Sequence, residues 1–296
     1  MLVVGGAGFL GSHLVDRLLA DGAAVDVVDD LTTGSLANLA EARAAGGTLK
    51  IHHLDAASDE CASLLGMRAP DVVYHLAAIP RIGGTPARLA AAFVTTTALL
   101  EAARSHRIPK VVVTVPATAL YGRPASRDLP LKEQAPEPRG VRGVVARATT
   151  DLLAIYREQH DVEFTALALS TVYGPRQRPD GGVVAAFASA AAERRAPIVR
   201  GDGRQTRDFL FVDDAVDALV RSGERGSGLV INVGTGEQTS IRDLWGLVGG
   251  PNGAEPTSEP APPDEIARFA VSSVRARIHL GWSAWTSLAD GLAELR

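Results

Sequence analysis

Three glycines close to the N-terminus have the spacing of a phosphate-binding turn. Gly5, Gly8 and Gly11 lie in GGAGFLG, directly after the apolar run Leu2–Val4 and before apolar residues at helical spacing. In such a strand–turn–helix, one glycine permits the tight turn, one lets the backbone approach a pyrophosphate, and one allows close helix–strand packing. The helix N-terminus then offers free N–H groups to the phosphates. The pattern predicts a dinucleotide site whose first contacts are Gly5, Gly8, Phe9, Leu10 and Gly11.

The next apolar run, Val25–Val28, ends in an acidic pair, Asp29 and Asp30. A carboxylate at the end of a second strand accepts hydrogen bonds from the ribose hydroxyls of adenosine and repels a 2′-phosphate. The pair therefore favours NAD(H) over NADP(H) as the cofactor. Asp29 follows the strand directly and is the first candidate, whereas Asp30 either joins it or begins the loop.

Strands and helices that alternate along the first half of the chain would position these residues. Further strands are predicted at 49–53, 72–76, 111–115 and 164–169, with helices at 11–20, 86–106 and 149–159. Such alternation predicts a Rossmann-type α/β fold, a doubly wound parallel sheet covered on both faces.

Glycine and proline become frequent from about residue 175. We therefore expect an NAD-binding Rossmann domain over 1–174 and a smaller C-terminal substrate lobe over 175–296, with parts of 208–248 returning to the first domain. The segment 249–264 is predicted to be a loop or linker.

Composition limits the class of protein. The chain has 296 residues, of which 46% are hydrophobic and 22% charged, as is normal for a soluble globular protein. A net charge of −4 gives no reason to expect nucleic acid or an anionic membrane as a partner. The single cysteine, Cys61, excludes an intramolecular disulfide and favours a reducing compartment. With no apolar run of membrane-spanning length and no signal-peptide pattern, we expect a cytoplasmic protein, and we expect no metal site.

Motifs spread over nearly the whole chain go beyond the glycine turn. They are GGAGFLGSHLVDRLLADG at 5–22, VDDLTTGSLANL at 28–39, DVVYHLAA at 71–78, LYG at 120–122, VYGPRQRP at 172–179, GDGRQTRDFLFVDDAVDAL at 201–219, NVGTGEQTSI at 232–241 and LGW at 280–282. Together they resemble the extended short-chain dehydrogenase/reductase superfamily and, within it, the NAD-dependent nucleotide-sugar epimerase/dehydratase family.

The resemblance implies further ligand contacts. Asp55 and Ala56, after the third strand, would meet the adenine, and Leu76, Ala77 and Ala78 would pass close to the pyrophosphate and ribose. The family also implies three substrate contacts. Arg176 and Arg207 match positions that bind a nucleotide diphosphate, and Thr171 matches the position of an asparagine before VYGP. Arginine suits bidentate phosphate contacts. A surface salt bridge is the alternative role for either arginine.

The family's catalytic residues are replaced in this chain. The family carries a Ser or Thr four residues before the Tyr of the YG pair, a Tyr-x-x-x-Lys opening a long helix, and often an Asn in the preceding helix. Counted back from Tyr121, the Ser or Thr position is Ala117, and the Asn position falls at Ala92. Alignment of the long helix on its later residues, 151–153 and 156, places the Tyr at Gly143 and the Lys at Arg147. None of the three lysines has a tyrosine four residues earlier.

These replacements remove ordinary acid/base chemistry. Alanine and glycine have no proton to exchange, and a positioned acid/base contributes roughly 10²–10⁴-fold in rate. Arg147 can still hydrogen-bond the cofactor's ribose, but it does not deprotonate near neutral pH. The candidates for a residual catalytic role are Thr118, Tyr121 and Arg147.

Three functions stay open. We favour an NAD-dependent epimerase or ketoreductase with a divergent site, acting on a nucleotide-linked sugar, because GDGRQTRDFLFVDD is retained. The alternatives are a catalytically inactive NAD-binding protein or partner subunit, and a non-redox enzyme on the same fold. The family also implies a homodimer through helices near 88–106 and 148–160. Apolar residues there either form that interface or pack on the sheet: Leu99, Leu100, Leu152, Leu153 and Ile155.

Overall fold

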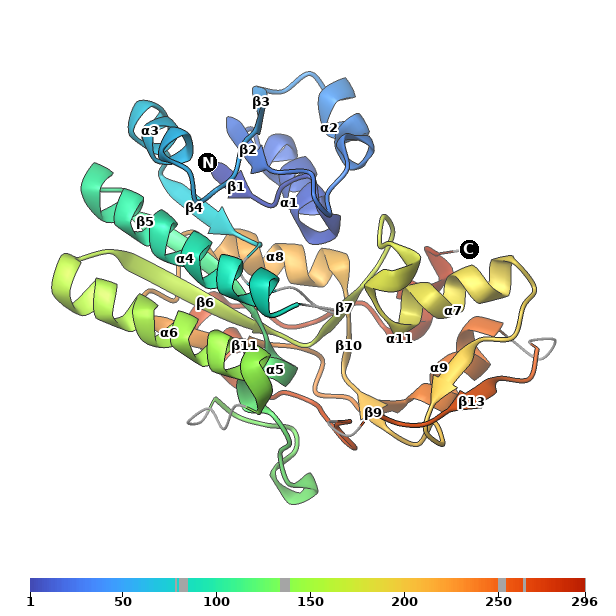
Figure 1. The fold of residues 1–296 in the computed structure, drawn as a ribbon. Coiled ribbons are helices and arrows are strands. Elements are labelled where there is room, and N and C mark those ends of the chain that lie inside the picture. Colours follow the sequence, from blue (N-terminus) through green and yellow to red (C-terminus); the bar gives the residue numbers. More distant parts are fainter. Residues whose placement is uncertain (78, 80–84, 134–138, 250–253, 263–264, 296) are drawn as a thin grey trace.

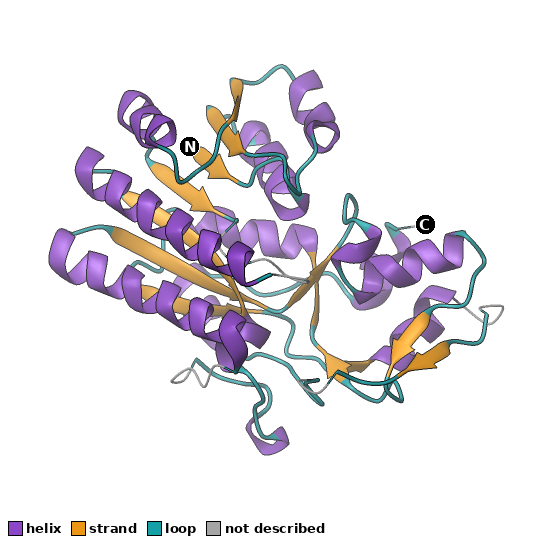
Figure 2. Cartoon of the chain, in the orientation of Figure 1, coloured by secondary structure: helices purple, strands orange, loops and turns teal. Residues whose placement is uncertain are grey.

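A seven-stranded parallel sheet forms the centre of the protein. The computed structural model describes residues 1–77, 79, 85–133, 139–249, 254–262 and 265–295. The strand order is β11-β6-β5-β4-β1-β2-β3, and every neighbouring pair is parallel. The strands are β1 (Leu2–Val4), β2 (Val25–Asp29), β3 (Leu49–His53), β4 (Val72–His75), β5 (Lys110–Pro116), β6 (Glu163–Leu169) and β11 (Leu229–Val233). The predicted Rossmann-type fold is confirmed (Figures 1 and 2).

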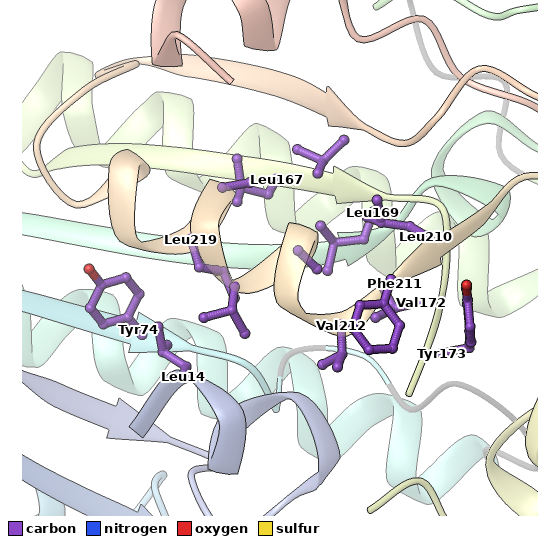
Figure 3. Packing of buried hydrophobic residues seen from close by; sticks show 14 of the residues in the cluster. Leu14, Tyr74, Leu167, Leu169, Val172, Tyr173, Leu210, Phe211, Val212 and Leu219 are labelled. Carbon is purple, nitrogen blue, oxygen red and sulfur yellow. The ribbon is translucent and has the colours of Figure 1, made fainter. Parts of the chain in front are cut away.

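Helices cover both faces of this sheet. On one face lie α1 (Phe9–Ala20) and α8 (Val212–Ser222); on the other lie α3 (Asp59–Arg68), α4 (Pro86–His106) and α6 (Gly140–His160). Successive strand residues point to opposite faces, so the sheet supplies two separate apolar cores. Val3 and Val27 join the core under α1 and α8, while Leu2 and Val4 join the other. Figure 3 shows the first core, where Leu14 of α1 and Leu219 of α8 meet strand residues.

The long helix α6 begins at Gly140, well before the predicted start near residue 149. Gly140 and Gly143 in its first turns are weak helix formers, which hid these turns from the sequence pattern. The N-terminal part of α6 is held by packing against α4 and against α5 (Ala117–Tyr121). Tertiary contacts therefore decide where this helix starts.

The C-terminal part of the chain builds smaller elements beside the sheet and also returns to it. The remaining elements are η1 (Leu36–Leu39), α2 (Ala40–Ala44), η2 (Ser126–Asp128), β7 (Thr171–Tyr173), η3 (Pro179–Gly181), α7 (Val183–Ala192), β8 (Ile198–Arg200), β9 (Thr206–Arg207), β10 (Phe209–Phe211), β12 (Thr239–Ser240), α9 (Ile241–Gly249), β13 (Thr257–Glu259), α10 (Val274–Leu280) and α11 (Leu288–Ala293). Strand β11 extends the main sheet, α8 packs on α1, and α10 packs on α8 and β11. Trp282 is buried and donates its indole N–H to the Asp214 carbonyl. Two C-terminal stretches, one with α8 and β11 and the other with α10 and Trp282, therefore pack with the main sheet.

One expected loop contains a strand. Within 249–264, Thr257–Glu259 forms β13, which pairs in parallel with β8. The prediction of a loop was therefore wrong for these three residues, because β8 offers a free edge that a composition rich in proline and glycine does not reveal. No helix among the described residues is long and apolar enough to cross a membrane.

Lys110, at the start of β5, is buried without a contacting carboxylate among the described residues. Its ammonium donates to the Ser227 hydroxyl at 2.5 Å, and burial lowers the pKa of Lys110 from 10.5 to about 8. Because the folded pKa lies below the unfolded one, the unfolded state binds more protons between these two pH values. We expect the free energy of unfolding of the native chain, relative to Lys110→Met, to rise by at most about 3 kcal/mol from pH 8 to 10.5. Urea unfolding at several pH values measures this difference; a pH-independent difference would contradict the prediction.

Candidate cofactor and substrate site

The glycine turn has the geometry that its sequence predicts. Gly5 has a φ of +80°, which favours glycine. A Cβ on Gly11 would lie 2.1 Å from the Gly5 carbonyl oxygen, so no side chain fits where α1 passes β1. A Cβ on Gly8 would meet only that same oxygen, at 3.2 Å. The turn thus leaves its outer side free for a phosphate, directly before the N-terminus of α1.

Asp29 holds this turn as well as facing the cofactor position. Its carboxylate accepts hydrogen bonds from the backbone N–H groups of Ala7 and Leu31, both at 2.9 Å. Burial, which outweighs these hydrogen bonds, raises the pKa of Asp29. Asp30 is exposed, and its carboxylate caps the loop by accepting from the N–H and hydroxyl of Thr32. The two acids therefore have different tasks.

A second brace on the turn was not predicted from the sequence. The Ala7 carbonyl accepts from the Ser35 N–H and from the Asn38 side-chain amide, both at 2.9 Å. The segment 35–38 therefore fastens the glycine turn from the other side. The serine N-cap of η1, in the string SLAN, was the available sequence signal.

A cavity of about 350 Å³ lies beyond the carboxyl ends of β2 and β3. It is lined by Asp29, Leu31, Leu36, Arg43, Ile51 and His53. Ligands of open α/β sheets bind at this edge, and apolar walls beside one carboxylate suit an adenosine. Asp55 follows β3 and is exposed, with its carboxylate accepting from the Ala57 N–H, and Ala56 is half-buried beside it. Their adenine contact stays a prediction.

The segment after β4 passes beside the glycine turn. The Leu76 N–H donates to the Val4 carbonyl at 3.0 Å, and a Cβ on Gly5 would come within 3.3 Å of the Ala77 nitrogen. Leu76 and Ala77 are therefore placed where a pyrophosphate on the turn would meet them. Ala78, predicted with them, lies outside the described residues.

His75, at the end of β4, is a buried neutral residue. Its Nε2 lies 3.0 Å from the Thr96 hydroxyl, which itself donates to the Ala92 carbonyl. Nε2 therefore carries the proton, and burial lowers the pKa of His75 to about 4. The contact joins β4 to α4 at Ala92, where the family pattern expects an asparagine.

Two hydroxyl groups follow β5, that of Tyr121, which is buried, and that of Thr118, which has no hydrogen bond to another described residue. The Tyr121 hydroxyl donates to the Asn232 side-chain oxygen at 2.7 Å, and burial raises its pKa. This hydroxyl has a fixed partner and is 4% exposed as a residue, so the structure argues against Tyr121 as an acid/base. Ala117 is fully buried, whereas Thr118 is half-buried and its hydroxyl has no hydrogen bond to another described residue. A catalytic role for Thr118 stays a prediction.

The helical register of α6 corrects one predicted contact. The Arg147 side chain is 52% exposed and pairs with Asp151 at 3.4 Å on the outer face. Ala146 is fully buried, and Arg142, one turn earlier, is half-buried with an internal Nε. The inward pair four residues apart is therefore 142 and 146, so Arg147 does not face a cofactor. The buried stripe through Ala146, Leu153 and Tyr156 was the signal for this register.

Of the predicted substrate contacts, the structure brings Thr171 and Arg207 together. The Thr171 N–H donates to the carbonyl of Asp208, the residue after Arg207. Arg207 donates to the carbonyls of Thr206 and Ile266, both at 2.7 Å, and forms a short ion pair with Glu265. Asp208, missed from the sequence, accepts four hydrogen bonds that fix this segment, from Thr235 N–H, Thr235 hydroxyl, Gly236 N–H and Val271 N–H.

Arg176 has the alternative role of a salt bridge. One terminal nitrogen contacts Asp16 at 2.6 Å and the other contacts Glu41 at 2.7 Å. Both partners belong to the glycine-turn side of the molecule, in α1 and α2. The guanidinium of Arg176 is thus engaged by two carboxylates, as that of Arg207 is engaged by Glu265 and two carbonyls, and the diphosphate contact of each arginine stays a prediction.

Comparison with known proteins decides the family. Residues 1–234 match the model of the NAD dependent epimerase/dehydratase family. This chain belongs to that family. The UDP-glucose 4-epimerase of Mycolicibacterium smegmatis is 40% identical over 307 residues, covering 99% of this chain and 96% of that protein.

Solved structures of this epimerase/dehydratase family agree. The Thermotoga maritima UDP-glucose 4-epimerase with UDP-glucose has a TM-score of 0.92 and 30% identity, covering 99% of this chain and 96% of that one. The Thermus thermophilus UDP-glucose 4-epimerase with NAD has a TM-score of 0.88 and 27% identity, covering 100% of this chain and 98% of that one. The superfamily resemblance is confirmed, and NAD is the cofactor of the family. The side-chain-free turn at Gly11 and the buried acid at Asp29 fit it.

Proposed function

We propose that this protein is an NAD-dependent epimerase or ketoreductase that acts on the sugar of a nucleotide sugar through a divergent active site. The observation that carries the proposal is the intact turn, with Gly11 against Gly5 and Asp29 fastened to Ala7, in a chain that also keeps Arg207. Its 40% identity to a UDP-glucose 4-epimerase supports the same substrate class.

In this proposal, separate groups of residues bind the cofactor, bind the substrate and assist proton transfer. The glycine turn and the N-terminus of α1 bind the pyrophosphate, and Asp29 binds the adenosine ribose. Arg207, beside Thr171, binds the nucleotide diphosphate. The Thr118 hydroxyl donates a hydrogen bond to a sugar oxygen, and a water molecule takes the proton that a tyrosine takes in the family pattern. Bound NAD supplies hydride exchange with a sugar carbon.

A non-catalytic NAD-binding protein is the second candidate. It is favoured by Ala117 and Ala146, both fully buried and without a group that exchanges protons. Such a protein would bind the same two ligands and turn over neither. The same experiment therefore decides between the two candidates.

The test offers a panel of nucleotide sugars, including UDP-glucose, UDP-galactose and UDP-glucuronate, to the purified protein with NAD. Interconversion is followed by NMR, and transfer of hydride by absorbance of NADH. We expect slow turnover that Thr118→Ala lowers by about tenfold or more, since its hydroxyl is the proposed hydrogen-bond donor to the reacting sugar oxygen. Thr97→Ala, which removes a hydroxyl bonded within α4, is the matched control. Tight NAD binding with no turnover of any nucleotide sugar would support the second candidate.

A homodimer through α4 and α6 is the assembly that we propose. Leu99, Leu100 and Leu153, expected as interface candidates, are buried inside the protomer. The outer face exposes four apolar side chains, of which Ile155 is one of the expected candidates: Val94, Val141, Val144 and Ile155. Val141, Val144 and Ile155 recur at helical spacing on α6, next to α4 (Figure 1).

Val144→Glu is expected to convert the dimer into a monomer, because a charge would have to be buried in an apolar contact. Light scattering after size-exclusion chromatography measures the mass. Ile278→Glu, at a residue that is 69% exposed on α10, is the matched control and should leave the mass unchanged. A native chain that is already monomeric at high concentration would contradict the proposal.

A further inference from the structure

Arg142, in the first turns of α6, carries a guanidinium without a partner in the described part of the chain. Its Nε is buried and has no hydrogen-bond acceptor, and none of its nitrogens has a hydrogen bond or ion pair to another described residue. Burial lowers the pKa of Arg142, and no neighbouring carboxylate among the described residues raises it. Other described arginines that lack an ion pair or hydrogen bond are exposed, so Arg142 is unusual in this chain.

The position of Arg142 places it at the reacting end of the site. It lies four residues before the buried Ala146, at the end of α6 that packs against α5. Helix α5 directly follows β5 and carries Thr118, whose hydroxyl has no partner among the described residues. Figure 1 shows α5 and this end of α6 together at the carboxyl edge of the sheet. A sugar held for hydride exchange would lie at this edge.

A desolvated cation without a counter-ion is energetically costly. Burying a charge is tolerated when a partner neutralises it, and removing that partner usually destabilises a protein. Neither Gly143 and Ala146, which follow Arg142 in α6, nor the ATALY sequence of α5, which packs on α6, supplies an acid. A ligand that brings its own negative charge would complete the pairing with bidentate, charge-assisted hydrogen bonds.

Resting on the proposed function, we propose that Arg142 is a specificity residue that selects a nucleotide sugar whose sugar ring carries a carboxylate. The phosphate groups of both ligands have other contacts, at the glycine turn and at Arg207, which leaves the sugar as the source of the anion. A guanidinium matches a planar carboxylate in two parallel N–H···O bonds. A neutral sugar such as glucose would bring no negative charge to Arg142.

The test compares two probes that differ only at carbon 6 of the sugar, UDP-glucuronate and UDP-glucose. Their affinities for the protein with NAD are measured by calorimetry, for the native chain, Arg142→Gln and the control Arg139→Gln. Arg139 precedes α6, is exposed and gives no side-chain cap. We expect the native chain and the control to bind UDP-glucuronate about 10–100-fold more tightly than UDP-glucose, and Arg142→Gln to bind both equally.

Two further titrations separate the possible sources of the anion. Affinity for NAD and for UDP should be the same in the native chain and Arg142→Gln. If Arg142→Gln weakens NAD or UDP instead of the uronate, the residue serves a phosphate and the proposal is overturned. Equal binding of the two probes by the native chain also overturns it, while failure to bind either probe would count against the proposed function itself.

Folding of the variant gives an independent readout. Removing a desolvated charge that has no partner among the described residues should leave the melting temperature of the ligand-free Arg142→Gln protein unchanged or raised. A marked fall in the melting temperature would show that Arg142 has a structural role, and the proposal would be wrong.

Discussion

Arg142→Tyr combined with Ala146→Lys is expected to raise the turnover of UDP-galactose by roughly 10²–10⁴-fold. The pair restores a tyrosine four residues before a lysine on the inward face of α6, beside α5. The lysine cation would lower the pKa of the tyrosine hydroxyl, which could then exchange a proton with the sugar. The rate is measured by NMR with NAD present.

The matched control places the same two residues one position later, as Gly143→Tyr with Arg147→Lys. Position 147 faces solvent, where Arg147 pairs with Asp151, so this pair should raise turnover by less than about tenfold. Because Ala146 is fully buried, thermal melting must show that the first variant folds. If it does not, Arg142→Tyr alone serves as the test, with a smaller expected gain. Equal gains in the two registers would contradict the assignment of the inward face.

Gly11→Ala is expected to weaken NAD binding by about 100-fold or more and to lower the melting temperature. A Cβ at this position would lie 2.1 Å from the Gly5 carbonyl oxygen and 2.8 Å from the Gly6 Cα, and backbone cannot move aside as a flexible side chain can. Helix α1 would have to separate from β1, which moves the N–H groups that face the pyrophosphate. NAD affinity is measured by calorimetry and stability by thermal melting.

Gly246→Ala is the control for that experiment. Gly246 lies within α9, and no atom is within 4 Å of a Cβ placed on it. Alanine there should be neutral or stabilise the protein by up to about 1 kcal/mol, because it is the better helix former. Unchanged NAD affinity in Gly11→Ala would show that the turn does not hold the pyrophosphate.

The cofactor half of the site was predictable because its signal is local. The glycines and the acid after β2 stand in one short segment, where the required backbone and burial follow from neighbouring residues. The main sheet was predictable for the same reason, since each strand is an apolar run between helical segments. The ends of the predicted strands moved, as where β2 includes Asp29, and β11 was not predicted as a strand.

The substrate half depends on contacts between distant segments. Arg176 and Arg207 both stand in family motifs, yet their partners come from α1 and α2 for one and from Glu265 for the other. The register of α6 was lost because the tyrosine and lysine that usually anchor it are absent. Which residues face inward there is set by packing against α4 and α5, which an alignment on Asp151 does not include.

The double contact of Asp29 has a consequence for cofactor engineering. The usual route to an NADP-dependent enzyme replaces this acid with a small residue to admit a 2′-phosphate. Here the same carboxylate oxygen that would be removed accepts the Ala7 N–H, in the middle of the turn. Replacing Asp29 alone would therefore also weaken binding of the pyrophosphate, which NAD and NADP have in common. An evolving or redesigned variant would need to reinforce the brace from Ser35 and Asn38 first.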